Sequence, residues 1–274
     1  MSKKVLGFIG AGNMAGSLIA GLLADAWPAD NIWAADVDER QTLRLGQHFG
    51  IHTTTDNPVV VAEADILVLA VKPQSMQQVA RGIAAQVQAR RPLVISVAAG
   101  ISLDALDDWL GGGIAVVRTM PNTPALVRSG ATALLANNQT TPDQRNQAEA
   151  ILRSVGLTVW VEAEILLDTV TALSGSGPAY FFLLMEAMEQ AAVNMGLDRE
   201  TARLLTQQTA LGAAKVAIES DETPAELRRR VTSPGGTTEQ AIAVFENKAL
   251  LSIVLEAMQA AGQRSDELSK LLRN

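Results

Sequence analysis

The chain has 274 residues, which predicts two domains because one domain usually takes about 100–200 residues. It is 48% hydrophobic with a net charge of −7, and this acidic balance excludes nucleic acid and anionic membranes as main partners, since both need a basic surface. The lack of cysteine excludes disulfides, thiolate metal sites and cysteine nucleophiles, and it fits a cytoplasmic location.

The first expected element is a strand at Val5–Ile9, followed by a turn at Gly10–Gly12 and a helix from Asn13 to about Ala24. A second interpretation exists, because Lys3 and Lys4 precede an uncharged run that resembles a secretory signal peptide. Five glycines within this run weaken an apolar helix of that kind. The strand, turn and helix account for all five. No later uncharged stretch reaches the ~20 residues needed to cross a bilayer.

Short apolar runs then alternate with helical patterns as far as residue 161. Strands are expected at Ile32–Ala35, Ile66–Val71, Leu93–Val97, Ile114–Thr119, Ala131–Leu135 and Leu157–Val161, and helices at Glu39–Phe49, Ser75–Ala89, Ser102–Leu110 and Pro142–Val155. Continuous Val, Ile and Leu strands separated by helices indicate a mostly parallel sheet covered on both faces. Because such crossovers are right-handed, we expect an α/β fold with a Rossmann-like, doubly wound sheet.

Only helical patterns follow Glu162. Long helices are expected at Pro178–Met195, Asp198–Ser220 and Ala249–Leu272, with shorter ones at Ile165–Leu173, Pro224–Val231 and Thr237–Phe245. We therefore expect a dinucleotide-binding domain at residues 1–161 and an all-helical domain at residues 162–274. The Pro178–Met195 helix is apolar almost all round, so it must be buried on every side. The helical layer offers little depth for that, which predicts a second subunit as the cover.

A glycine-rich turn, Gly10-x-Gly12-x-x-Ala15, joins the first strand to the first helix, which is the context of the dinucleotide fingerprint. Gly10 permits the tight turn, Gly12 lets the backbone approach a pyrophosphate, and Ala15 allows close packing of helix and strand. The helix N-terminus then offers N–H groups to the phosphates. The alternative is a glycine turn with a purely structural role.

Asp36 ends the second strand, where a carboxylate bonds the hydroxyls of the adenosine ribose. A carboxylate there would repel the 2′-phosphate of NADP, and Val37 rather than an arginine follows it. Arg40 is the cation close enough in the chain to reach back. An ordinary surface acid in a β–α turn is the alternative, because such turns favour aspartate.

Three more segments follow expected strands, where ligands bind in open α/β sheets. They are Ala70-Val71-Lys72-Pro73, Val97-Ala98-Ala99-Gly100 and Met120-Pro121-Asn122-Thr123-Pro124. Lys72 is the only lysine between Lys4 and Lys215, and the two prolines beside Asn122-Thr123 suit a rigid wall against a nicotinamide ring. For each segment, the alternative is that its glycine or proline residues only end a strand and shape a loop.

In the second domain, successive N–H groups at Gly235-Gly236-Thr237 lead into a helix and suit a carboxylate. A simple loop with a threonine N-cap is an equal alternative from these residues alone. Only two histidines exist, His48 and His52, too few for a histidine-rich metal site, and we expect no metal.

These motifs together resemble the pyrroline-5-carboxylate reductase family over essentially the whole chain. The resemblance is carried by Gly7–Met14, Ala70–Pro73, Ser96–Gly100, Met120–Pro124, Ser174–Tyr180 and Arg230–Glu239, the last of which falls on the family's most distinctive signature. It implies reduction of 1-pyrroline-5-carboxylate to L-proline, the last step of proline biosynthesis, with hydride from NADPH or NADH. It also implies a homodimer built by the helical domain, often within a ring of dimers.

The resemblance also implies the residues of the site. Cofactor binding is expected from Ile9, Gly10, Ala11, Gly12, Asn13, Met14, Asp36, Asn57, Ala70, Val71, Lys72, Pro73, Val97, Ala98, Ala99, Met120, Pro121 and Asn122. Substrate binding is expected from Ser233, Gly235, Gly236, Thr237 and Thr238, and the catalytic candidates are Thr238, Lys72 and Ser176. Thr238 matches the threonine that contacts the ring nitrogen in this family.

Two other functions were compatible with the same fold. Dehydrogenases of the 3-hydroxyacid and 6-phosphogluconate type need a lysine early in the second domain, and this chain has none from residue 73 to 214. The other alternative is a non-catalytic, nucleotide-sensing protein. The threonine–glycine site in the second domain argues against it only weakly.

Overall fold

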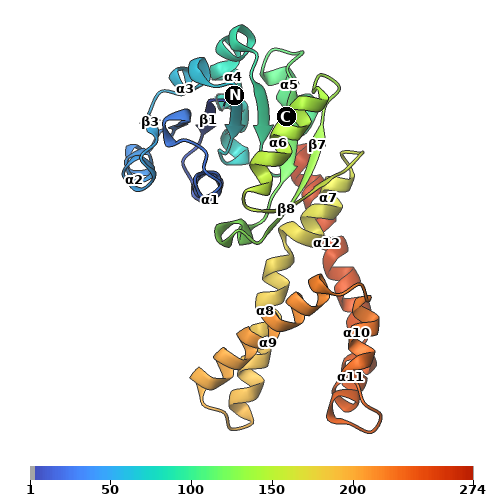
Figure 1. Ribbon diagram of the computed structural model, residues 1–274. Coiled ribbons are helices and arrows are strands. Elements are labelled where there is room, and N and C mark those ends of the chain that lie inside the picture. The colour runs from blue at the N-terminus through green and yellow to red at the C-terminus, as the bar shows by residue number, and fades with distance from the viewer. Residues whose placement is uncertain (1–3, 274) are drawn as a thin grey trace. The chain divides into compact units, whose positions relative to one another are not determined.

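The computed structural model describes residues 4–273 and consists of two compact units (Figure 1). Unit 1 comprises Met1–Ser176 together with Ala260–Asn274, and unit 2 comprises Gly177–Gln259. Lys3, one of the two lysines before the first strand, lies outside the described residues.

Unit 1 is built on one eight-stranded sheet with the order β3-β2-β1-β4-β5-β6-β7-β8. The strands are β1 Leu6–Ile9, β2 Ile32–Ala35, β3 His52–Thr54, β4 Ile66–Leu69, β5 Leu93–Ser96, β6 Val116–Met120, β7 Gly130–Ala136 and β8 Gly156–Trp160. Neighbouring strands run parallel except β6 and β7, which are antiparallel. The expected mostly parallel, Rossmann-like sheet is confirmed.

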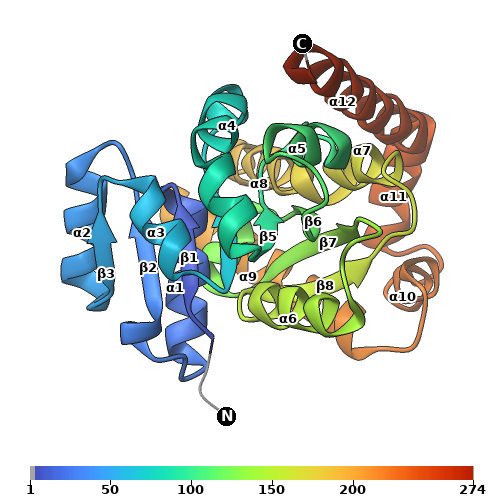
Figure 2. The ribbon, with the colours of Figure 1, turned by 90° about the horizontal axis from the view of Figure 1, so that it is seen from above.

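Helices cover both faces of this sheet (Figure 2). They are α1 Asn13–Ala24, α2 Glu39–Phe49, α3 Asn57–Glu63, α4 Pro73–Arg90, α5 Leu103–Trp109, α6 Pro142–Arg153 and α7 Leu166–Val170, with short η1 Ala29–Asn31, η2 Thr123–Val127 and η3 Thr171–Gly175. One buried cluster joins α1, α2 and α6 to the sheet, and a second joins α3, α4 and α5. The sheet is therefore doubly wound: the chain adds strands toward one edge from β1 to β3, and toward the other edge from β4 onward.

Local signals in the sequence explain several helix starts. Asp38 caps α2 by accepting the Arg40 N–H, and Ser102 caps α5 by accepting the Ala105 N–H. A capping box between Thr141 and Gln144 opens α6. Helix α4 begins at Pro73, two residues earlier than expected, because a proline in the first turn forfeits no helical hydrogen bond.

Two elements of unit 1 were not expected from the sequence, β3 and α3. Strand β3 consists of His52, Thr53 and Thr54 and lies at the sheet edge beside β2, so it needs no apolar run. Helix α3 has only seven residues, too few to display a helical period.

The units divide at Ser176, beyond the 161/162 boundary that the end of the strand pattern suggested. Helix α7 and η3 pack with the sheet, since Leu167 joins a buried cluster with Ala133 and Leu135 of β7. Helix α12, Leu250–Arg273, begins in unit 2, and its last part belongs to unit 1. There the Ser265 hydroxyl donates to Asp168 Oδ1 at 2.7 Å.

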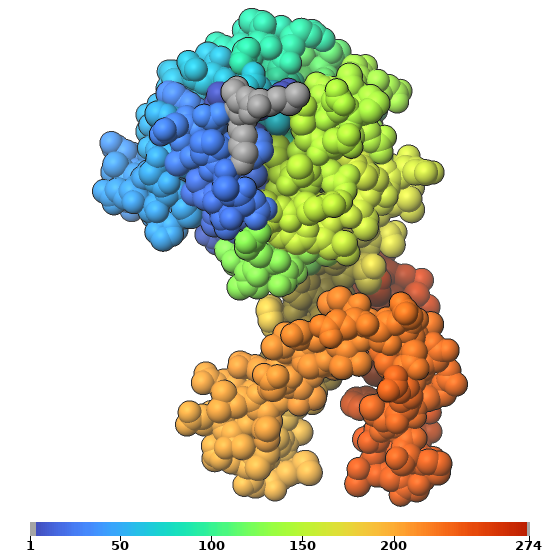
Figure 3. Space-filling model, in the orientation of Figure 1, coloured from blue at the N-terminus to red at the C-terminus, as the bar shows by residue number. Residues whose placement is uncertain are grey.

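Unit 2 contains no strand among its described residues. Its helices are α8 Gly177–Asn194, α9 Arg199–Glu219, α10 Pro224–Arg230, α11 Thr237–Asn247 and the first part of α12. Helices α8 and α9 pack side by side, and a gap opens between the lower part of this pair and the lower part of the α10–α11 segment (Figures 1 and 3). Phe181, Phe182 and Leu183 of α8 are each more than 60% exposed. The apolar circumference of α8 is thus left uncovered within one chain.

None of the helices described between residues 4 and 273 is long and apolar enough to cross a membrane.

Candidate active site

A cleft of about 650 Å³ opens at the carboxyl ends of β1, β2 and β4. It is lined by Ile9, Gly10, Gly12, Ala35, Asp36, Val37, Asp38, Gln41, Asn57, Pro58, Ala70, Val71, Lys72, Ser75, Gln78, Val79, Gly82 and Ile83. This edge of the sheet, where the winding reverses between β1 and β4, is where doubly wound folds bind ligands. Eight of the expected cofactor residues line it.

The glycine-rich turn forms one wall of the cleft. Gly10 has a φ of +101°, and a Cβ at this position would lie 2.6 Å from the Ala70 carbonyl oxygen, so only glycine fits. Gly12 precedes α1 and is exposed, and a Cβ there would point into open space. A side chain at Gly12 would therefore meet whatever binds in the cleft. The N-terminus of α1 has no side-chain cap, which leaves its first N–H groups open to an anion.

The Asp36 carboxylate holds this turn in place. Its Oδ2 accepts the Ala11 N–H at 2.7 Å, and its Oδ1 accepts the Asp38 N–H at 3.0 Å. Each carboxylate oxygen can accept a second hydrogen bond, so Asp36 can still bind a ligand hydroxyl. The sequence suggested a ribose-binding acid at this position but gave no sign of its bond to the glycine turn.

Charge in the cleft is unevenly distributed. Asp36 and Asp38 follow β2, whereas Lys72 follows β4 on the other side of β1, two strand spacings or about 10 Å away. Among the described residues of the lining, Lys72 is the one cation. Arg40 does not line the cleft, and its guanidinium donates to both oxygens of Asp38. This pairing lowers the pKa of the Asp38 carboxyl, which stays ionised at neutral pH.

The other expected cofactor residues lie outside this lining. They are Ala11, Asn13, Met14, Pro73, Val97, Ala98, Ala99, Met120, Pro121 and Asn122. Ala11 is buried beneath the turn, and Asn13 lines a separate hollow with Gly16 and Phe49. The segments after β5 and β6 continue along the same edge of the sheet, in the strand order β4-β5-β6.

Two of the expected segments meet in unit 1 although some 50 residues separate them. The Asn122 side chain donates through Nδ2 to the Ser174 carbonyl at 3.0 Å and accepts the Ala131 N–H at 2.9 Å. Gly175 packs so closely on Met120 that a Cβ would lie 2.6 Å from the methionine Cε. Ser174 and Gly175 belong to the π-helical turn η3, a local geometry that often occurs at functional sites. Ser176 ends this turn, and its N–H donates to the Thr171 carbonyl.

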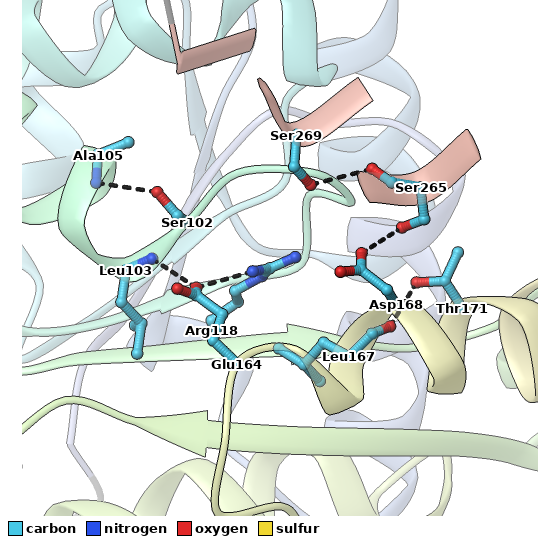
Figure 4. Close-up of polar contacts among 10 residues, drawn as sticks. All are labelled: Ser102, Leu103, Ala105, Arg118, Glu164, Leu167, Asp168, Thr171, Ser265 and Ser269. Atoms are coloured by element: carbon cyan, nitrogen blue, oxygen red, sulfur yellow. Dashed lines mark hydrogen bonds and ion pairs between the residues drawn. The ribbon is translucent and has the colours of Figure 1, made fainter. Parts of the chain in front are cut away.

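A polar cluster supports the loop that follows β5 (Figure 4). Arg118 of β6 is buried and donates to Glu164 Oε1 at 2.7 Å, and the same oxygen accepts the Leu103 N–H at 2.8 Å. Beside it, Ser265 of α12 donates to Asp168. Gly100 closes the Val97–Gly100 loop with a φ of +75° and lies against Ser269 and Leu272 of α12. These contacts set the position of the expected nicotinamide-side loop.

The Ser233–Thr238 segment lies in unit 2 and precedes α11. Here the structure differs from the sequence-based expectation of three open N–H groups. Gly235, with a φ of +72°, donates to Glu239 Oε2 at 2.8 Å, and the Gly236 N–H bonds the Ser233 carbonyl. Because the first N–H groups of a helix lack internal acceptors, the open donors begin at Thr237 and Thr238. Thr238 is half-buried, and its hydroxyl has no partner among the described residues.

Sequence reasoning missed one wall of the cleft, formed by Ser75, Gln78, Val79, Gly82 and Ile83 of α4. Only the helical period of α4 could have indicated which of its residues face the strand ends. It also missed Gln41 in the first turn of α2, for which the sequence carries no signal.

Two family models match the chain. Residues 5–100 match the family described as NADP oxidoreductase, coenzyme F420-dependent, and residues 164–268 match pyrroline-5-carboxylate reductase dimerisation. The second match covers all of unit 2, all of α7 and most of α12, so the helical region carries a dimerisation domain through which the chain self-associates.

Relatives match along the full length. The pyrroline-5-carboxylate reductase of Pseudomonas aeruginosa is 50% identical, and the match covers 99% of each chain. The structure of the Coxiella burnetii pyrroline-5-carboxylate reductase aligns with a TM-score of 0.93 and 44% identity, covering 97% of this chain and 98% of that one. The Plasmodium falciparum pyrroline carboxylate reductase, a structure with NADP bound, aligns with a TM-score of 0.87 and 28% identity, covering 98% and 99%.

Proposed function

Since this chain belongs to the pyrroline-5-carboxylate reductase family, we infer that it reduces 1-pyrroline-5-carboxylate to L-proline, the last step of proline biosynthesis, at the expense of NADH or NADPH. The observation that carries the inference is the cleft at the β1–β4 reversal in a chain that also bears the family's dimerisation domain.

The residues of the cleft fit a nicotinamide dinucleotide. Gly12 leaves open space where a pyrophosphate approaches, and the uncapped N-terminus of α1 offers N–H groups and a partial positive charge. Asp36 keeps acceptor capacity for ribose hydroxyls, and Lys72 offsets phosphate charge. When bound, the reduced nicotinamide supplies the hydride that converts the C=N bond of the substrate to a C–N bond. We propose that the segments after β5 and β6 hold the nicotinamide end.

The substrate is a cyclic imine that carries a carboxylate. We propose that the open N–H groups at the start of α11, at Thr237 and Thr238, bind the carboxylate, and that Ser233, Gly235 and Gly236 shape the turn that presents them. The Thr238 hydroxyl, which has no partner in the described protein, hydrogen-bonds the ring nitrogen and orients the ring.

The reduction does not require a side-chain acid to donate a proton. An imine nitrogen is basic enough to arrive protonated, so the protein's task is to position the substrate carbon and to stabilise the charge distribution of the transition state. Lys72 and Ser176 are proposed as further catalytic residues. Lys72 is exposed at the N-cap of α4 within the cleft, and Ser176 follows the turn that Asn122 anchors.

The proposal extends to assembly and location. We propose that the homodimer assembles further into a ring of dimers, a decamer, which sedimentation velocity would distinguish from an isolated dimer by mass. We also propose a cytoplasmic location, because the reduced nicotinamide that the reaction consumes is an intracellular metabolite. Fractionation of cells with an antibody against the protein tests this.

One experiment tests the proposed function directly. The purified protein is mixed with 1-pyrroline-5-carboxylate and either NADH or NADPH, and cofactor oxidation is followed by absorbance while proline is quantified by amino-acid analysis. We expect one proline for each cofactor oxidised. Cofactor binding without proline formation would contradict the proposal and would favour a nucleotide-sensing role.

A further inference from the structure

The last part of α12 connects α7 to the loop after β5. At the α7 end, the Ser265 hydroxyl donates to Asp168 Oδ1 at 2.7 Å, on a residue that is only 6% exposed (Figure 4). At the other end, a Cβ on Gly100 would lie 3.4 Å from Leu272 Cδ1 and 3.7 Å from Ser269 Oγ. Residues 265, 269 and 272 are spaced by four and three, so they lie on one face of the helix. This face therefore contacts both α7 and the loop.

The two loops that we propose for the nicotinamide end both depend on this region of unit 1. The loop after β5 contributes Ala98 and Ile101 to a buried cluster, and Leu272 of α12 packs against that cluster. The segment after β6 is held by η3, which directly follows α7, through the bond from Asn122 to the Ser174 carbonyl. Helix α7 and the end of α12 thus lie behind the part of the site where hydride transfer is proposed.

We propose that Ser265 is a positioning residue for the nicotinamide end of the cofactor. Its bond to Asp168 fixes the last two turns of α12, and Leu272 in these turns fixes the Val97–Gly100 loop. Because Ser265 is buried behind this loop, it acts through the loop and not on the cofactor itself. No described residue of α12 lines the cleft that contains Asp36, so the adenosine end does not depend on Ser265.

This inference rests on the proposed function only for the identity of the cofactor. Its test compares the affinities of the full-length protein for NADH and for ADP, measured by calorimetry. ADP keeps the adenosine and the two phosphates but lacks the nicotinamide, so the ratio of the two affinities reports on the nicotinamide end. A protein that made no proline but showed the expected change in this ratio would contradict the proposed function and leave this inference standing.

The key variant is Ser265→Ala, which removes the hydroxyl and leaves the helix otherwise unchanged. NADH must then order a loop that α12 no longer holds, so we expect its affinity to fall about three- to tenfold, up to the net effect of one hydrogen bond. The affinity for ADP should stay unchanged. Asp168→Asn keeps a side-chain oxygen that accepts the Ser265 hydroxyl, and it should retain most of the wild-type ratio.

Two further experiments serve as controls, and the melting temperature of each variant confirms that it is folded. Asp168→Ala and Ser265→Ala remove the same bond, so their effects on the ratio should not add in the double variant. Thr169→Ala changes an exposed residue next to Asp168 on α7 and should leave both affinities unchanged. The proposal is overturned if Ser265→Ala leaves the ratio at its wild-type value, whether it weakens both ligands equally or neither. Full additivity in the double variant would also overturn it.

Discussion

Unit 1 and unit 2 bury their apolar side chains in different ways. In unit 1, two large clusters of aliphatic side chains on the two faces of the sheet are almost fully buried within one chain. In the described helices of unit 2, Ala202 is the one hydrophobic residue in the buried core, while large side chains on α8, α9 and α11 remain exposed. Unit 1 therefore forms its core alone, whereas unit 2 exposes its apolar side chains and carries the dimerisation domain, so we expect another subunit to cover them.

The difference has a consequence for function. The cofactor cleft is lined by residues of unit 1, so one chain supplies it. The Ser233–Thr238 loop lies in unit 2, which carries the dimerisation domain and leaves large apolar side chains exposed in one chain. Dinucleotide binding should therefore survive in a dissociated chain, whereas proline formation should not.

The largest expected effect comes from a charge placed on α8. Leu183→Glu puts a carboxylate on a side chain that is 67% exposed in one chain, and we expect the dimer to bury it. An unpaired buried charge costs about 3–5 kcal/mol, and a symmetric interface contains it twice, so the dimer should weaken by about ten-thousandfold or more.

Light scattering measures this dissociation, and Leu43→Glu, an exposed leucine in α2 of unit 1, is the matched control. We expect the Leu183→Glu protein to bind NADH while making no proline. A wild-type chain that is a stable, folded monomer at micromolar concentration would contradict the comparison between the two units.

The second prediction concerns the substrate loop of unit 2. Thr238→Ala removes a hydroxyl that has no partner in the described protein, so the fold and cofactor affinity should be unchanged. If the hydroxyl bonds the reacting ring in the transition state, kcat/KM should fall. The loss of transition-state stabilisation should be about 2–4 kcal/mol, as for a preorganised oxyanion donor. Steady-state kinetics measure the loss, and Thr238→Ser should recover part of the activity. A wild-type kcat/KM in the alanine variant would remove Thr238 from the site.

The third prediction tests whether a buried ion pair within one chain stabilises unit 1. Glu164→Ala leaves the Arg118 guanidinium buried without its carboxylate and deprives the Leu103 N–H of its acceptor. Because the Glu164 side chain is 35% exposed, we expect a loss near the lower end of the range for broken buried pairs, about 3 kcal/mol.

Urea unfolding of unit 1 measures this loss. Glu164→Gln should lose less, since its amide oxygen still accepts hydrogen bonds. Glu162→Ala, an exposed acid two residues earlier, should stay within about 0.5 kcal/mol of wild type. Equal effects of Glu164→Ala and Glu162→Ala would show that the Arg118 pair contributes nothing to stability.

Much of unit 1 could be predicted because its signals are local. Gly10, Gly12 and Asp36 stand at fixed places relative to two strands, and the parallel strands are continuous apolar runs. The apolar circumference of α8 likewise indicated a partner, and the dimerisation domain confirms self-association. The edge strand β3 escaped prediction because pairing with β2 on one side needs no buried face.

The remaining features depend on contacts between distant residues. Nothing near Glu239 in the sequence indicates that its carboxylate takes the Gly235 N–H, which moves the open donors to Thr237 and Thr238. Nothing near Asp36 indicates that it holds Ala11, and the boundary after Ser176 depends on the packing of α7 against β7. Such pairings follow from the three-dimensional arrangement of the chain, which local patterns do not specify.

The smallest expected effect concerns cofactor preference in unit 1. In the binding mode proposed above, the Asp36 charge lies beside the 2′-position of the ribose, with Val37 next to it in the chain and Arg40 engaged by Asp38. We therefore expect wild-type protein to use NADH at least as well as NADPH, and Asp36→Ser to shift the ratio of kcat/KM toward NADPH by up to about tenfold, or about 1.4 kcal/mol, because solvent screens the repulsion.

The bond from Ala11 to Asp36 adds a control to this experiment. Asp36→Asn removes the charge but keeps an oxygen that can accept the Ala11 N–H, so it separates repulsion from the support of the glycine turn. If repulsion sets the preference, Asn and Ser should shift the ratio equally. If support of the turn matters more, Ser should weaken both cofactors and Asn neither. A wild-type protein that prefers NADPH more than tenfold, with no change in either variant, would show that the Asp36 charge plays no part in cofactor choice.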